Sequence, residues 1–170
     1  ACVFPGQGSQ SVGMLKELAE TSPIIEATFK EASDALGYDL WDLVQNDADG
    51  KLNETHITQP ALLAASVAIW RVIREHGIDV DYLAGHSLGE YSALVCGGAM
   101  DFADAIKLVE ARGKYMQEAV PAGAGAMYAI IGLDDAAIAD ICQQTAIATG
   151  DVVAPVNFNS PGQVVIAGEK

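Results

Sequence analysis

The hydrophobic positions in the first half of the chain form short continuous runs and helical stripes. Residues 1–4 and 80–84 are short, largely apolar and bounded by turn residues, which predicts two buried strands. Between them, apolar residues recur at helical spacing in segments that predict helices over residues 12–20, 22–37, 40–44 and 58–77. The last of these is apolar nearly all round until Arg71, so we expect it to be buried on most sides.

The pattern after residue 84 predicts a helix followed by a change of character. Helical spacing continues through residues 91–96 and from Asp101 to about Val120, and the small residues 121–125 then form a candidate boundary. Beyond it the pattern predicts a strand over 126–131, a helix from Asp134 or Asp135 through Thr145, and strands over 152–157 and 164–167. This order is the first two thirds of a ferredoxin-like β-α-β-β-α-β unit. We therefore expect an α/β protein with two domains, residues 1–123 and an incomplete ferredoxin-like subdomain over 124–170.

Composition narrows the classes of function that remain. The chain has 170 residues, 51% of them hydrophobic, which is ample for a core. Its net charge of −14 and the lack of a basic run argue against a nucleic-acid partner. An acidic surface also repels anionic ligands, so any such ligand needs a local cationic group.

The cysteines and the apolar runs of the sequence indicate the cellular location of the protein. Cys2, Cys96 and Cys142 form no C-x-x-C pair and no even framework, which indicates reduced thiols in a cytosolic protein. The start of the chain lacks a secretory signal, and the longest apolar run, residues 61–70, is well short of the roughly 20 residues that cross a bilayer. We expect a soluble, cytoplasmic monomer without membrane association.

Ser87 lies between Gly85 and Gly89 in the G-x-S-x-G spacing of a nucleophile elbow. The predicted strand before it and helix after it would force the serine through a tight, strained turn and push its hydroxyl outward at the positive end of the helix. The N–H of Leu88 would then face an oxyanion forming on an acyl group attached to Ser87. An ordinary glycine-rich strand-to-helix turn is the alternative.

Local sequence pattern alone does not assign a function to two further features, a glycine-rich loop and Arg112. Residues 5–10 form a second glycine-rich loop that matches neither common nucleotide-binding fingerprint and by itself predicts only a turn. Arg112 falls on the shoulder of the apolar stripe of its helix, where an unpaired buried charge is prohibitive. Its guanidinium must reach water along its stem, pair with an internal acid, or clamp a ligand carboxylate. These three possibilities stay open.

A serine nucleophile needs a base, and the chain offers only three histidines. His86 adjoins the serine and suits a pocket wall better, His76 belongs at the opposite end of the strand, and His56 cannot be placed. Either the serine is idle or its histidine lies beyond Lys170. The incomplete small unit favours the second choice.

Four motifs in order carry a family resemblance: residues 4–10 (FPGQGSQ), 85–91 (GHSLGEY), 112–113 (RG) and 157–163 (NFNSPGQ). Together they closely resemble the bacterial malonyl-CoA:acyl carrier protein transacylases of type II fatty acid synthesis. The resemblance covers essentially all 170 residues, about the N-terminal half of a member. It implies an α/β-hydrolase-like core with a parallel sheet, and a ferredoxin-like subdomain packed over the site.

The resemblance also implies a role for each matching position. The enzyme would take malonyl from coenzyme A as a serine ester and pass it to the phosphopantetheine thiol of acyl carrier protein. Coenzyme A thioester would be a substrate, with no cofactor and no metal. The implied residues are Ser87 as nucleophile, the N–H groups of Gln7 and Leu88 as oxyanion hole, Arg112 on the malonyl carboxylate, and His86 and Asn157 lining the acyl pocket.

Two other functions remain open. The Gly85–Gly89 motif alone would suit a serine thioesterase or esterase of the α/β-hydrolase type. Such an enzyme has no need of Arg112 on the apolar shoulder. The chain could also be a non-catalytic acyl-binding module that kept the pocket without its base.

Overall fold

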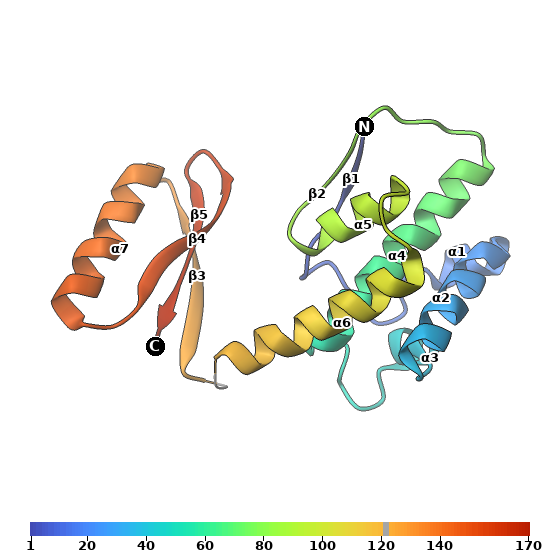
Figure 1. Cartoon of the computed structure of the whole chain (residues 1–170), viewed down its shortest axis with the longest axis horizontal. Coiled ribbons are helices and arrows are strands. Elements are labelled where there is room, and N and C mark those ends of the chain that lie inside the picture. Colours follow the sequence, from blue (N-terminus) through green and yellow to red (C-terminus); the bar gives the residue numbers. More distant parts are fainter. Residues whose placement is uncertain (121–122) are drawn as a thin grey trace. The chain divides into compact units, whose positions relative to one another are not determined.

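The computed structural model describes residues 1–120 and 123–170, which divide into two compact units, Ala1–Gln117 and Glu118–Lys170 (Figure 1). Residues 121 and 122 of the predicted boundary segment lie outside the described residues. The domain limits at residues 123 and 124 therefore stay a prediction.

The first unit combines helices with a parallel pair of strands. Strand β1 pairs in parallel with β2, so that Cys2 lies opposite Leu83 and Phe4 opposite Gly85. The predicted α/β class with a parallel sheet is confirmed at this level. The elements, in chain order, are β1 (Cys2–Phe4), α1 (Lys16–Thr21), α2 (Pro23–Leu36), α3 (Leu40–Asn46), α4 (Thr55–Glu75), β2 (Leu83–Gly85), α5 (Leu88–Cys96) and α6 (Phe102–Ala119), whose last two residues fall in the second unit.

Several element boundaries differ from the predictions. The helix predicted from residue 12 begins at Lys16, because Gly13 and Leu15 have φ angles of 78° and 65°, which no right-handed helix contains. The strand predicted over 80–84 is Leu83–Gly85, since the strand that pairs with it spans only three residues. Helix α4 starts at Thr55 rather than residue 58 and carries Pro60 inside it.

Helix α4 forms the centre of the core of the first unit. Every residue from 57 to 68 is buried, as its apolar pattern predicts. Side chains of the other helices pack around it, among them Phe29, Leu40, Leu88, Phe102 and Ile106. Leu88 is 1% exposed, so burial of this side chain anchors the first turn of α5 directly beside Ser87.

The second unit is a small antiparallel sheet with one helix. Its elements are β3 (Gly125–Ile131), α7 (Asp135–Thr149), β4 (Val153–Ser160) and β5 (Gln163–Glu169). The strand order is β3-β5-β4, and β5 is antiparallel to both neighbours. Ile138 and Cys142 of α7 pack against Val164 of β5. The predicted strand–helix–strand–strand order is observed, while its assignment as ferredoxin-like stays a prediction.

The helices and the side chains that could bind metal bear on membranes and ligands. None of the helices over 1–120 and 123–170 has both the length and the apolar content to cross a bilayer. The same ranges hold no group of three or more potential side-chain metal ligands. Cys2, Cys96 and Cys142 are free thiols.

Candidate active site

Ser87 occupies a strained turn between strand β2 and helix α5. Its φ and ψ angles are 51° and −107°, a conformation that costs a residue with a side chain about 1–3 kcal/mol. Two hydrogen bonds close the turn: Gly89 N–H donates to His86 O at 2.9 Å, and Glu90 N–H donates to Ser87 O at 3.2 Å. The serine side chain is exposed. This is the strand–turn–helix geometry of a nucleophile elbow.

The two glycines of the motif are required because backbone segments touch at both positions. A Cβ on Gly85 would collide with the backbone of Gly89, and a Cβ on Gly89 would collide with Phe4 O at the end of β1. Neither obstacle can move aside as a flexible side chain would. The turn around Ser87 is therefore closed tightly against the end of β1, where the first glycine-rich loop begins.

This contact brings the first glycine-rich loop, residues 5–10, to the elbow. His86 N–H donates to Phe4 O at 3.2 Å, and a Cβ on Gly6 would lie 2.9 Å from His86 O. Gln7 follows Gly6, and its side-chain Nε2 donates to Thr55 Oγ1 at 3.3 Å. The loop that sequence pattern treats as a simple turn thus lies beside the serine.

The amide of Leu88 is available by its position in the helix. Leu88 is the first residue of α5, and the first N–H groups of a helix have no acceptor within it. The amides of Gln7 and Leu88 therefore come from two segments that touch where Gly6 lies against His86. Positive charge is concentrated at such a helix start, which favours a developing anion there.

Arg112 of α6 reaches the same place from the other side. Its Nη2 donates to Ser87 Oγ at 3.1 Å and its Nη1 donates to Gln59 Oε1 at 2.7 Å. The guanidinium carbon lies 5.5 Å from the ring centroid of Tyr91. None of the ion pairs among residues 1–120 and 123–170 involves Arg112. Of the three possibilities for this charge, pairing with an internal acid is not what the structure contains.

Gln59 is a site residue that sequence analysis did not single out. It is 0% exposed in α4, and its Nε2 lies 3.2 Å from Met116 Sδ of α6. The sequence signal that could have identified Gln59 is an amide side chain within an otherwise apolar helix. The hydrophobic pattern indicates only that Gln59 lies at the start of that helix. Arg112, whose guanidinium binds Gln59, is 53 residues further along the sequence, so local spacing gives no indication of this pair.

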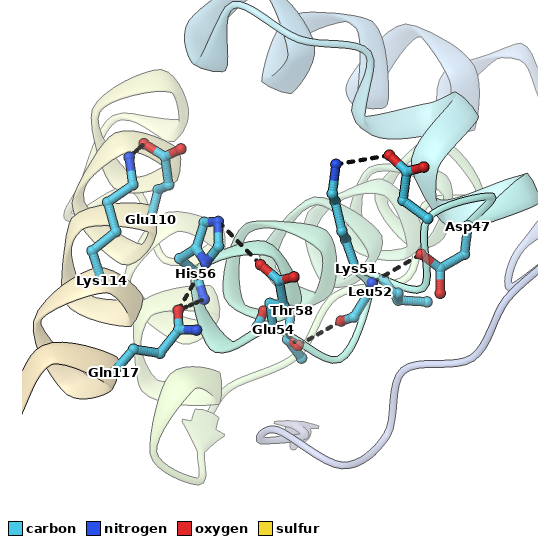
Figure 2. A network of polar contacts seen from close by, with 10 residues as sticks. Asp47, Lys51, Leu52, Glu54, His56, Thr58, Glu110, Lys114 and Gln117 are labelled. Carbon is cyan, nitrogen blue, oxygen red and sulfur yellow. Dashed lines mark hydrogen bonds and ion pairs between the residues drawn. The ribbon is translucent and has the colours of Figure 1, made fainter. Parts of the chain in front are cut away.

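Two of the three histidines have partners away from Ser87. His56 Nδ1 donates to Gln117 Oε1 at 2.7 Å, and its backbone N–H donates to the same oxygen at 3.1 Å (Figure 2). This pair joins the start of α4 to α6. His76 follows the last residue of α4, and its Nδ1 lies 2.8 Å from Val72 O. His86 is exposed beside Ser87 and borders Gly6.

Asn157 belongs to the second unit. It lies on β4 opposite Val165 of β5 and is half-buried. The structure thus brings Ser87, Leu88, His86 and Arg112 together in the first unit, and it places Gly6, the neighbour of Gln7, against His86. A place for Asn157 in the same site stays a prediction.

The fold and the turn define the class of the protein: an α/β protein with a serine on a nucleophile elbow. The family model described as the acyl transferase domain matches residues 1–170, and the chain belongs to this family.

Relatives of known name and structure agree with this membership. The chain is 67% identical over 171 residues to the malonyl CoA-acyl carrier protein transacylase of Salmonella typhimurium, covering 100% of the chain and 55% of that relative. A crystal structure of an acyl carrier protein S-malonyltransferase from Vibrio cholerae matches with a TM-score of 0.93 and 66% identity, covering 99% of the chain and 55% of the other.

A further solved structure contains a carrier protein. It is that of a type II PKS acyl-carrier protein in complex with its malonyl-transacylase, with a TM-score of 0.94 and 65% identity over 99% of the chain and 54% of the other. The chain spans about half the length of the curated relatives it matches.

Proposed function

We propose that the protein carrying these residues transfers malonyl from coenzyme A to the phosphopantetheine thiol of acyl carrier protein, in type II fatty acid biosynthesis. Membership of the acyl transferase domain family and the names of the relatives support this. The observation that carries it is the 3.1 Å contact between Arg112 Nη2 and Ser87 Oγ, which sets a cation beside the hydroxyl that would take the acyl group.

The proposed reaction has two steps, in which Ser87 is first the nucleophile and then the leaving group. Its Oγ attacks the thioester carbonyl, the C–S bond breaks, coenzyme A leaves as a thiol and malonyl remains as a serine ester. The carrier thiol then attacks this ester, a C–S bond forms, the bond from the acyl carbon to Ser87 Oγ breaks, and the proton lost by the thiol returns to Ser87 Oγ. The N–H groups of Gln7 and Leu88 would stabilise the oxyanion of each tetrahedral intermediate.

Arg112 would hold the malonyl carboxylate. A guanidinium binds a carboxylate through two parallel hydrogen bonds, which fixes the orientation of the acyl group as well as its charge. The net charge of −14 makes such a local cation necessary for an anionic substrate. A thioesterase acting on uncharged acyl groups would have no use for this arginine.

The remaining assignments complete the proposal. His86 and Asn157 would line the acyl pocket, and the β-α-β-β unit would be part of a ferredoxin-like subdomain. Because His56 and His76 are engaged elsewhere, we place the base in the part of full-length relatives that this chain does not span. The α/β-hydrolase-like description of the core belongs to the same proposal. A cytoplasmic location and a monomeric state stay predictions.

The test uses the full-length protein and Ser87→Ala as its control. After incubation with malonyl-CoA, intact-protein mass and peptide mapping should show one malonyl group on Ser87, and holo-acyl carrier protein should remove it. Steady release of malonate without carrier protein would instead indicate a thioesterase. Binding of malonyl-CoA without an adduct would indicate a non-catalytic acyl-binding module.

A further inference from the structure

The side chain of Gln59 is held at both ends in the interior of the first unit. It is 0% exposed, and burying an amide is costly unless its polar atoms are bonded. Its Oε1 accepts from Arg112 Nη1 at 2.7 Å, while its Nε2 lies 3.2 Å from Met116 Sδ, a weak acceptor. The cation on one side and the sulfur on the other fix which end of the amide faces the arginine.

Within the part of the chain that the structure describes, the side chains that contact the guanidinium of Arg112 are electrically neutral. They are the amide oxygen of Gln59, the hydroxyl of Ser87 and the ring of Tyr91. Arg71, further along α4, is different, because its Nη1 pairs with Glu31 Oε2 at 2.7 Å. The positive charge of Arg71 is thus paired with an acid, whereas that of Arg112 has no acidic partner among residues 1–120 and 123–170.

We propose that Gln59 is a positioning residue that sets selectivity for an acyl group bearing a carboxylate, an inference that rests on the proposed function. Its amide holds the guanidinium of Arg112 toward Ser87 without neutralising it. A glutamate of the same size would hold the guanidinium equally well but would pair with its charge. The arginine would then have little attraction left for a substrate carboxylate, and a second carboxylate would be repelled.

The decisive variant in the full-length protein is therefore Gln59→Glu. The readout is kcat/KM for malonyl-CoA and for acetyl-CoA, which offers the same thioester without a carboxylate. Malonyl transfer should fall about 10- to 100-fold, mainly through KM, as expected for a lost charge-assisted pair. Acetyl transfer should change by less than about threefold, because it never uses the charge of Arg112.

Two further variants separate charge from structure. Gln117→Glu makes the same change of net charge on α6, where the side chain can still accept from His56, so both activities should stay at the wild-type level. Gln59→Met removes the amide and keeps the volume. It should lower the malonyl-to-acetyl ratio by releasing the guanidinium, and it carries the test if Gln59→Glu does not fold.

Each possible result either supports or overturns the inference about Gln59. A collapsed malonyl-to-acetyl ratio in Gln59→Glu, with Gln117→Glu unchanged, supports the inference. An unchanged ratio, or equal loss of both activities, would overturn it and leave Gln59 as a packing residue. If the wild-type protein forms no malonyl adduct on Ser87, the proposed function itself fails, and this is seen before any Gln59 variant is measured.

Discussion

The guanidinium of Arg112 donates a hydrogen bond of 3.1 Å to the hydroxyl oxygen of Ser87, across 25 residues of sequence. The contact joins the middle of α6 to the turn before α5. It places the cation and the hydroxyl of the candidate site within one hydrogen bond of each other in the absence of any ligand. An acyl group bound to Ser87 would carry its substituents into the reach of this arginine.

Replacing this arginine should separate the two acyl substrates. Arg112→Ala should raise the barrier to malonyl transfer by about 2 kcal/mol, or about 30-fold in kcat/KM, the scale of a hydrogen bond to a charged group. Acetyl transfer should be equal to wild type or easier. Arg74→Ala removes an exposed arginine paired with Asp79 and serves as the control. Equal losses for malonyl and acetyl would argue that Arg112 holds no carboxylate.

The close crossing of α4 and α6 predicts an effect of unusual sign at Gly113. Within a helix, glycine to alanine normally stabilises by up to about 1 kcal/mol. At Gly113 the added Cβ would collide with the backbone of His56, so Gly113→Ala should lower the free energy of unfolding by about 1–3 kcal/mol. Urea unfolding measures this, with the exposed Lys107→Ala as control, expected within about 0.5 kcal/mol of wild type. Stabilisation by Gly113→Ala would contradict this crossing.

The backbone strain at Ser87 can be measured by two substitutions of the same residue. Glycine tolerates a φ of 51° that alanine does not, so Ser87→Gly should be more stable than Ser87→Ala by about 1 kcal/mol. That figure allows for the greater entropy of glycine in the unfolded chain. Both variants lack the hydroxyl and should be inactive in transfer. If Ser87→Ala were the more stable variant in urea unfolding, the positive φ would be in doubt.

Burial of Cys96 predicts a loss of stability in alkali. Desolvation raises the pKa of its thiol from 9.0 to about 12, with a smaller increase from nearby Cys2 and an opposing effect of Arg71. The stability contributed by an acid whose pKa is raised by folding is fully present below the unfolded pKa and is lost progressively as the pH rises toward the folded pKa. The free energy of unfolding should therefore fall as the pH rises from about 9 toward 12, less steeply in Cys96→Ala. Identical slopes for wild type and variant would refute the assignment.

Local chemistry explains which parts of the site could be predicted from sequence. The turn at Ser87 follows from two glycines, a strand before it and a helix after it, all within residues 80–96. The place of the first glycine-rich loop depends on the pairing of β1 with β2, whose partners are some 80 residues apart. It was available only through the family resemblance.

Site residues that are positioned by packing between helices distant in sequence could not be predicted from the sequence. Gln59 and His56 lie on α4 and bind side chains of α6 because Gly113 lets the helices approach closely. The hydrophobic periodicity of a helix does not indicate where that helix crosses another one. The late start of α1 has a similar cause, since the φ of 65° at Leu15 is uncommon for its residue type and gives no compositional signal.

Competitive labelling of Ser87 tests the central claim most directly. The full-length protein is incubated briefly with equal concentrations of malonyl-CoA and acetyl-CoA. The malonylated and acetylated forms of the peptide containing Ser87 are then quantified by mass spectrometry. We expect a malonyl ester on Ser87 in large excess over acetyl, and a reversal of this preference in Arg112→Ala. A wild-type peptide that carries no ester, or carries the two acyl groups equally, would contradict the account.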